Sequence, residues 1–355
     1  MKKLDFNETE KSEGFELNSE NKETISFEEE NTEKKLKAEV LKEKTGIKRD
    51  GNILGAAFLA MTAVVNLLNY AVYLLAFILS FISKEAGEFF FDPAVMQVEQ
   101  ILFAITAFIL PFIVVFKLAD TRISDLVSFS LPEKKTILPF FLMGIGFCSF
   151  ANVSVSFAES IFSRTNINYE VPKPQNPEGI FGFLLVLIST VFVPALVEEF
   201  ICRGIILGYL KKYGEGFAVV ISALLFGVMH GNFEQTPFAF LVGLVLGYIT
   251  VKSKTIWIAV LVHGFNNLIS VVISYLPNSL NDYINLGYII FIILSLLGGI
   301  VSLLLLNGKD DDFYRFAKPE NEVVTSGKKI VWFLSSASII IYLIICLITS
   351  VQYFF

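Results

Sequence analysis

Histidine, tryptophan and cysteine are scarce in this sequence, whose 355 residues include only two His, two Trp and three Cys. Cys148, Cys202 and Cys346 lie inside apolar runs and lack the spacing of a disulfide framework or a metal motif. We therefore predict small core residues at all three positions. Internal repeats, a glycine-rich phosphate loop and an inverted pair of broken helices are also missing, so neither a nucleotide site nor a transporter is favoured.

An excess of basic charge is missing as well. The net charge is −6, and half of it falls in the first fifty residues. Nucleic-acid-binding proteins need a positive surface, so we exclude nucleic acid as a partner. A cleavable signal peptide would show a short apolar core near the start, but the first apolar run follows about fifty polar positions. We expect no such peptide.

Charge is concentrated at the N-terminus. Residues 1–50 hold eleven Lys or Arg and fourteen Asp or Glu, whereas the other 305 residues share 37 charges. With so few apolar residues, the segment 1–50 predicts a largely disordered cytoplasmic tail. Residues 34–50 could instead form a charged amphipathic helix on the membrane surface, because Leu36, Val40 and Leu41 recur at helical spacing. The density of charge favours a solvated linker.

The remainder of the chain, residues 51–355, consists mainly of apolar runs. The sequence is 54% apolar with a mean hydropathy of +0.64, which is unusual for a water-soluble globular protein. A helix needs about twenty apolar residues to cross roughly 30 Å of hydrocarbon. Candidate runs of that length begin near Asn52, Gln97, Thr136, Gly179, Gly216, Pro237, Thr255, Ile284 and Lys329. We predict an all-α fold, a polytopic transmembrane helical bundle of about eight or nine spanning helices, eight if one weak span is re-entrant.

The distribution of Lys and Arg predicts the orientation of this bundle. With the N-terminus inside, the four cytoplasmic loops would carry thirteen Lys or Arg, and the four loops on the opposite side would carry three. Short loops rich in these residues stay in the cytoplasm. We predict a multi-pass protein of the cell membrane with a cytoplasmic N-terminus, and the Lys-, Asn- and Ile-rich composition is typical of an AT-rich bacterial source.

Few ionisable side chains fall within the predicted spans. Glu198, Glu199 and Arg203 lie in one apolar run, and both histidines of the chain, His230 and His263, lie in others. A charged group costs about 2.5 to 3.5 kcal/mol at the centre of a membrane helix, so groups at this depth are functional candidates. A single histidine could still be a satisfied core residue. The two histidines together with Glu198 favour a catalytic site.

Helical spacing separates the roles of the two glutamates. Residues four apart share a helix face, so Glu199 faces Arg203, while Glu198 points about 100° away without a partner. An unpaired carboxylate in such a place suits a general base that activates water. The structural alternative is that both glutamates only balance Arg203 in a buried network.

The histidine-bearing helices predict the rest of the site. His263 and Asn267 share a face and could donate two hydrogen bonds to one developing oxyanion. Phe226, four residues before His230, could pack against the imidazole or be an ordinary core phenylalanine. A rise of about 1.5 Å per residue from the cytoplasmic loops brings Glu198, His230 and Asn267 to a similar depth.

Glu198-Glu199-x-x-x-Arg203, Phe226-x-x-x-His230 and His263-x-x-x-Asn267 resemble the three signature motifs of the CAAX prenyl protease and bacteriocin-processing (CPBP, Abi) family, whose members include type II CAAX prenyl endopeptidases. The resemblance extends over a protease core of about residues 179–273. It implies an intramembrane glutamate protease in which Glu198 and His230 activate water, while His263 and Asn267 hold the oxyanion. Glu199 and Arg203 would support them.

The resemblance leaves three questions open. Members are often called metalloendopeptidases, and Glu198, His230 and His263 could bind zinc, but we favour no cofactor because a metal at His263 would remove an oxyanion donor. A non-catalytic bacteriocin self-immunity or scaffold protein is the alternative from another class. The expected substrate is a membrane-associated protein or peptide in the lipid bilayer, prenylated or not.

Overall fold

The protein is described by a computed structural model that covers residues 19–162, 164, 169–172, 175–307, 313–319 and 322–354. Helices make up nearly all of these residues, and none of them is in a β-strand, so the all-α prediction is confirmed for this part of the chain. The chain divides into two units, residues 1–45 and residues 46–355, which are described separately.

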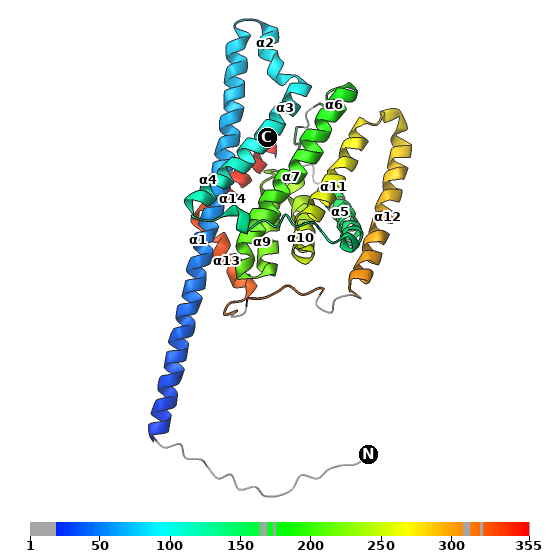
Figure 1. Cartoon of the computed structure of the whole chain (residues 1–355). Coiled ribbons are helices and arrows are strands. Elements are labelled where there is room, and N and C mark those ends of the chain that lie inside the picture. The colour runs from blue at the N-terminus through cyan, green and yellow to red at the C-terminus, as the bar shows by residue number, and fades with distance from the viewer. Residues whose placement is uncertain are drawn as a thin grey trace, which may run out of the picture. The chain divides into compact units, whose positions relative to one another are not determined.

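The helices occur in the following order (Figure 1). The first part comprises α1 (Ser19–Ser80), α2 (Lys84–Glu88), η1 (Phe89–Phe91), α3 (Pro93–Phe103), η2 (Ala104–Ile109), α4 (Leu110–Leu118), η3 (Ile123–Asp125) and α5 (Lys134–Phe162). The central part comprises α6 (Gly179–Val186), η5 (Leu187–Phe192), α7 (Val193–Glu199), η6 (Phe200–Ile206), α8 (Leu207–Leu210), η7 (Lys211–Tyr213), α9 (Glu215–Val228), α10 (Gln235–Ser253) and α11 (Trp257–Tyr275). The last part comprises η8 (Asn278–Leu280), α12 (Asn281–Asn307), α13 (Ser326–Leu334), α14 (Ala337–Val351) and η9 (Gln352–Phe354).

The N-terminal unit is helical where the structure describes it. Helix α1 begins at Ser19, so residues 19–50 differ from the largely disordered tail expected from composition, and residues 1–18 lie outside the described residues. Glu and Lys are good helix formers. Pairs four residues apart add to the helix, with Lys34 Nζ 2.6 Å from a Glu30 oxygen and Lys37 Nζ 2.6 Å from a Glu33 oxygen.

Eight helical segments are long and apolar enough to cross a membrane, among the residues described. They are Glu30–Ser80, Pro93–Leu118, Lys134–Ile161, Gly179–Tyr213, Gln235–Ser253, Trp257–Tyr275, Asn281–Asn307 and Ala337–Phe354. The predicted run that begins near Gly216 became α9, which has 14 residues and is about 21 Å long at 1.5 Å per residue. The predicted polytopic bundle of eight or nine helices is therefore confirmed.

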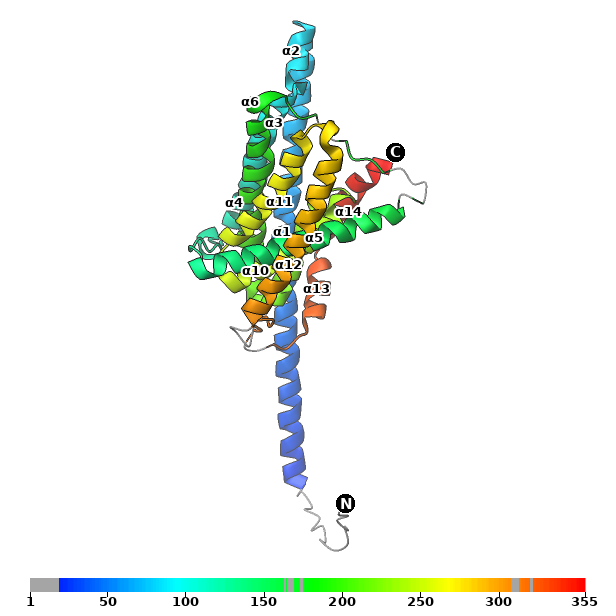
Figure 2. The same ribbon diagram turned by 90° about the vertical axis from the view of Figure 1, so that its right-hand side faces the viewer.

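Small residues allow close helix packing on both sides of the site. In the hairpin of α9 and α10, a Cβ at Gly243 would lie 2.9 Å from the Ala223 Cα. In the crossing of α5 with α12, a Cβ at Gly146 would lie 2.8 Å from the Gly299 Cα, and Ser149 Oγ is 2.7 Å from Ser295 Oγ. Such small-residue contacts are typical of membrane helices. Figure 2 shows α5 running obliquely across α11 and α12.

Asp50 joins α1 to the end of the helix that carries the glutamates. Its buried carboxylate accepts hydrogen bonds from the hydroxyls of Tyr209 at 2.9 Å and Tyr213 at 2.8 Å, and lies 2.6 Å from Lys212 Nζ. The sequence analysis placed Asp50 in the solvated tail. Arg49 Nε is a fourth partner at 3.0 Å, and a buried carboxylate with four partners shows instead that the packed unit begins before residue 51.

Candidate active site

The glutamate-bearing helix is widened on both sides of the glutamates. Segments η5 and η6 are π-helical, and the short α-helix α7 between them ends with Glu198 and Glu199. In a π-helical turn the backbone hydrogen bonds join residues five apart instead of four, and such turns often occur at functional sites. Here two backbone carbonyls accept side-chain donors from other helices: Thr190 O from Asn267 Nδ2 at 3.0 Å, and Cys202 O from Ser222 Oγ at 2.7 Å.

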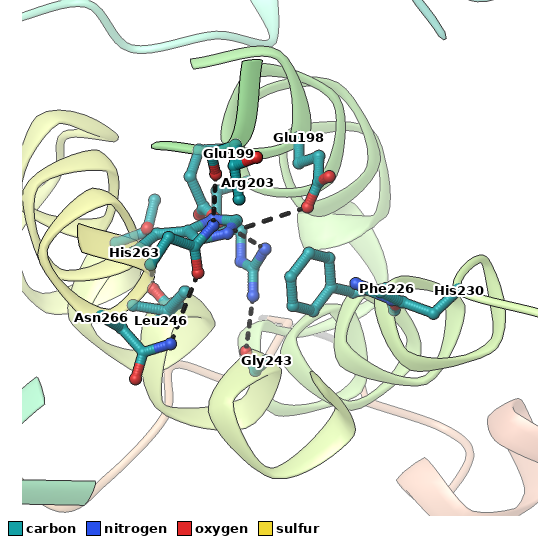
Figure 3. A network of polar contacts seen from close by, with 12 residues as sticks. Glu198, Glu199, Arg203, Phe226, His230, Gly243, Leu246, His263 and Asn266 are labelled. Atoms are coloured by element: carbon teal, nitrogen blue, oxygen red, sulfur yellow. Dashed lines mark hydrogen bonds and ion pairs between the residues drawn. The ribbon is translucent and has the colours of Figure 1, made fainter. Parts of the chain in front are cut away.

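Glu199 is the centre of the polar network (Figure 3). One oxygen, Oε1, lies 2.9 Å from Arg203 Nη1 and 2.8 Å from His263 Nδ1. All three residues are buried. The Glu199–Arg203 pair predicted from the four-residue spacing is present, and His263 is an additional partner that the spacing did not indicate. The other oxygen of Glu199, Oε2, is buried without a hydrogen-bond partner.

Arg203 has two further contacts. Its Nη2 donates to the Gly243 carbonyl of α10 at 3.3 Å, and its guanidinium carbon lies 4.3 Å from the centre of the Phe226 ring. A guanidinium over an aromatic face is stabilised by a cation–π interaction. Arg203 therefore links η6 to both helices of the α9–α10 hairpin.

Glu198 lies at the edge of this network rather than inside it. Its side chain is 17% exposed, against 0% for Glu199, and its Oε2 is 3.8 Å from His263 Nε2. Because Nδ1 of His263 is bonded to Glu199, Nε2 is the nitrogen left for chemistry. Among the described residues, Glu198 therefore contacts His263, whereas the sequence analysis paired Glu198 with His230.

His230 lies at the end of α9, where the chain turns toward α10. Its Nδ1 is 2.8 Å from the Phe226 carbonyl, so a proton on Nδ1 is donated there and Nε2 remains available. The Phe226 ring packs edge-on against both imidazoles, with ring centres 5.2 Å from His230 and 5.8 Å from His263. Phe226 thus contacts Arg203 and both histidines, as Figure 3 shows.

Asn267 is held by the π-helical turn. Its Nδ2 donates to the Thr190 carbonyl, and its Oδ1 lies 3.4 Å from Asn266 Nδ2. A side-chain amide has two N–H donors, so one remains for a substrate atom. Its place beside η5, on the same helix as His263, is compatible with the predicted oxyanion role.

Asn232 is a residue that the sequence analysis missed. It is buried, and its Nδ2 donates to the His230 carbonyl at 3.0 Å, while its Oδ1 accepts from the Gln235 N–H at 2.8 Å. Asn232 therefore caps the start of α10 and holds the His230 backbone at the same time. Asparagine before a helix is a known N-capping signal, but His-Gly-Asn alone does not indicate which carbonyl the amide reaches.

The alternative zinc set does not fit this arrangement. No group of three or more His, Cys, Asp or Glu side chains is placed to hold a metal ion in the part of the chain that the structure describes. Zinc needs its ligands at about 2.0 to 2.3 Å from one point. We therefore derive no step through a metal at Glu198, His230 and His263.

Comparisons with known proteins concern the same segment. Residues 180–269 match the family model described as Type II CAAX prenyl endopeptidase Rce1-like. The protein named "Putative membrane peptidase YdiL" of Bacillus subtilis (strain 168) is 30% identical over 95 residues, or 26% of this chain and 38% of that protein. The chain thus aligns with less than half the length of this relative. No solved structure matches the chain described here.

The matched range contains all seven residues that the sequence analysis selected, from Glu198 to Asn267, and the π-helical turn at Thr190. It also contains the hydrogen-bonded network of Glu199, Arg203 and His263. Residues 180–269 of this chain are therefore similar to the type II CAAX prenyl endopeptidase Rce1-like family, and the similarity covers the whole of the candidate site.

Proposed function

We propose that this protein is an intramembrane endopeptidase of the CAAX protease type, which hydrolyses peptide bonds of a membrane-associated protein or peptide. The observation that carries this proposal is the polar network buried among apolar helices, with Glu198 at its accessible edge. Charged groups buried at this depth are costly, so they indicate a function, and here the Glu198 carboxylate and Nε2 of His263 lie 3.8 Å apart without a hydrogen bond to other described residues. The family of residues 180–269 supports the same activity.

Glu198 is the proposed general base. It removes a proton from water, the water oxygen bonds to the peptide carbonyl carbon, and the proton then passes to the leaving amine as the C–N bond breaks. His230 holds the water from the other side through Nε2, since its Nδ1 is directed to the Phe226 carbonyl. The 17% exposure of Glu198 is what gives it access to water, in contrast to Glu199.

Glu199 orients His263. The carboxylate accepts from Nδ1, which fixes the ring and stabilises its protonated form, as an acidic residue does for the histidine of a catalytic triad. A protonated His263 donates from Nε2 to the developing oxyanion, and the second N–H of Asn267 Nδ2 is the other donor. Glu199 and Arg203 are positioning residues in this scheme.

The substrate class is proposed from the family name and the membrane setting. The name of the matching family specifies CAAX prenyl substrates, so a prenylated C-terminal peptide is the first candidate. A leader or exported peptide without a lipid group is the second. The cleavage chemistry is the same for both, so a direct comparison of prenylated and unprenylated peptides is needed to distinguish them.

Two other readings remain alternatives to this proposal. A zinc metalloprotease would use the same residues, but no three His, Cys, Asp or Glu side chains of the described part of the chain are placed to hold one metal ion. A non-catalytic bacteriocin self-immunity or scaffold protein would not need an accessible Glu198. It would require only the ion pairs that hold the helices together.

The test compares peptide termini generated in membranes. Cells that express the wild-type protein, Glu198→Gln or His230→Ala are analysed for new N- and C-termini by mass spectrometry. Products are expected with the wild type and with the control variant Glu99→Gln, but not with Glu198→Gln or His230→Ala. Loss of a general base slows hydrolysis about 10² to 10⁴-fold. Glu99→Gln is the matched control, because Glu99 lies in a spanning helix but outside the network.

The same three variants are then assayed in nanodiscs with a farnesylated peptide that ends in a CAAX sequence and with its unprenylated form. Cleavage of the farnesylated form alone would assign the prenyl class. If Glu198→Gln and His230→Ala generate the same termini as the wild type while they accumulate normally in the membrane, the protein is not a Glu198-dependent protease.

A further inference from the structure

A small polar cavity lies on the other side of α11 from the Thr190 contact. It is formed by α5, α11 and α12 and has a water-accessible volume of about 20 Å³. Its polar lining residues are Ser149, Asn152, Asn266, Ser270 and Tyr288. All five lie within segments apolar enough to span the membrane, where polar groups of this density are unusual.

Several of these groups have no hydrogen-bond partner among the described residues. Ser149 is bonded to Ser295 and Asn266 donates to Asn267, but the Asn152 amide and the Ser270 and Tyr288 hydroxyls make no hydrogen bond to the described protein. An unsatisfied amide or hydroxyl in an apolar environment costs about 1 to 3 kcal/mol. Asn152 and Tyr288 are half-buried and Ser270 is exposed, and together they offer a polar occupant of the cavity three groups to hydrogen-bond.

The size and chemistry of the cavity match water. A cavity needs roughly 10 to 15 Å³ of probe-occupied volume and two to four polar partners to hold one water molecule. The cavity meets both requirements, whereas its volume is too small for a lipid chain or a peptide side chain of ordinary size.

The cavity is connected to the candidate active site through α11. Asn266 lines the cavity and donates to Oδ1 of Asn267, one of the two proposed oxyanion residues. Asn266, Ser270 and Ser274 recur at four-residue intervals toward the end of α11, where Ser274 Oγ accepts from Asn176 Nδ2 at 3.1 Å. Ser270 lies only about 7.5 Å from that end, at 1.5 Å per residue.

We propose that this cavity is a water-binding site that hydrates the Asn266–Asn267 turn and supplies the water consumed in peptide-bond hydrolysis. The hydration depends only on the cavity, whereas the supply role rests on the proposed protease function. Each hydrolysed bond consumes one water, which must reach a site surrounded by apolar helices. The row of polar residues along α11 is a path from the nearer end of the bundle.

Hydration is tested by cysteine labelling in a background that lacks Cys148, Cys202 and Cys346. Asn152→Cys places a thiol at the half-buried wall of the cavity and Ser270→Cys places one at its exposed edge, and Phe150→Cys and Val272→Cys are the matched controls at exposed apolar positions of the same two helices. A water-soluble, membrane-impermeant thiosulfonate reacts with the thiolate, which forms only where water is present. The cavity thiols should be labelled at least about tenfold faster than the controls.

The supply role is tested with Ser270→Leu and Asn152→Leu, which fill the cavity without altering a residue of the proposed catalytic network. Cleavage in nanodiscs should slow several-fold with an unchanged KM. Because the two positions lie on different helices, one variant decides the question if the other does not fold. Equal labelling of cavity and control thiols would overturn the hydration proposal.

The outcomes separate the two proposals. If the cavity thiols are labelled but the leucine variants cleave at the wild-type rate, the supply role is wrong and the hydrated cavity is retained. If the wild type cleaves nothing, the protease function fails, while the labelling result still decides whether the cavity holds water.

Discussion

One oxygen of Glu199 contacts both Arg203 and His263. The change in unfolding free energy when the Glu199 charge is removed can be measured. Removing one partner of a buried ion pair is expensive because the other charge remains buried and unpaired, at about 3 to 5 kcal/mol. Arg203 would keep only the Gly243 carbonyl and the Phe226 ring. The network is thus a structural requirement as well as a chemical one.

We predict that Glu199→Gln and Arg203→Met each lower the unfolding free energy by about 3 to 5 kcal/mol, and that the double variant costs less than the sum. Replacing both charges removes the unpaired partner that makes each single change costly. Denaturant unfolding in mild detergent measures all three. Strict additivity of the two single effects would show that the pair does not interact.

The absence of a three-ligand set among the described residues predicts the response to chelators. We expect 1,10-phenanthroline and EDTA to leave the cleavage rate within about twofold of the untreated rate. A metal-dependent enzyme would instead lose its activity when the chelator removes its ion. The purified protein is assayed with and without each chelator. Inactivation that added Zn²⁺ reverses would contradict the carboxylate–imidazole mechanism.

Among the elements, the turn between α9 and α10 has the most direct link to His230. Asn232 has two roles there, since its Oδ1 caps α10 and its Nδ2 holds the His230 carbonyl. The variants Asn232→Asp and Asn232→Ala separate these roles. Aspartate retains the capping oxygen and loses the donor, whereas alanine loses both.

We predict that both variants lower kcat, and that only Asn232→Ala also loses about 1 kcal/mol of stability through the missing cap. The kcat loss is expected because the His230 carbonyl is no longer fixed. Thermal unfolding and the cleavage assay are measured on the same samples. A kcat of Asn232→Asp equal to that of the wild type would mean that the amide donor does not position His230.

At the scale of the whole molecule, Asp50 connects α1 to the end of the helix that carries Glu198 and Glu199. We predict that Asp50→Ala destabilises the protein by about 3 kcal/mol, because the two tyrosine hydroxyls and Lys212 lose a buried acceptor. Arg49→Ala is the comparison variant: Arg49 Nε also lies 3.0 Å from Asp50 Oδ1, but the Arg49 side chain is 69% exposed, so loss of this one partner should cost little. Thermal unfolding in detergent compares the two.

The outcome at Asp50 has a clear alternative. Equal melting temperatures of Asp50→Ala and the wild type would show that apolar packing alone holds α1 in place. The membrane orientation, with a cytoplasmic N-terminus, stays a prediction from the distribution of Lys and Arg.

The sequence by itself determined the membrane class, the helical architecture and the local part of the site. Apolar run length is a one-dimensional property, so the spanning helices could be located directly. The Glu199–Arg203 pair follows from a four-residue spacing on one helix, and it is present at 2.9 Å. Even the short α9 corresponds to a run that the sequence indicated, although not to its final length.

Tertiary structure decided the contacts between helices. The bond from His263 to Glu199 joins residues 64 positions apart, and that from Asn267 to Thr190 joins residues 77 apart and depends on a π-helical turn. No helical spacing specifies either contact. The packing and rotation of the helices decide which histidine each glutamate contacts, because residues on different helices meet only when the helices pack together.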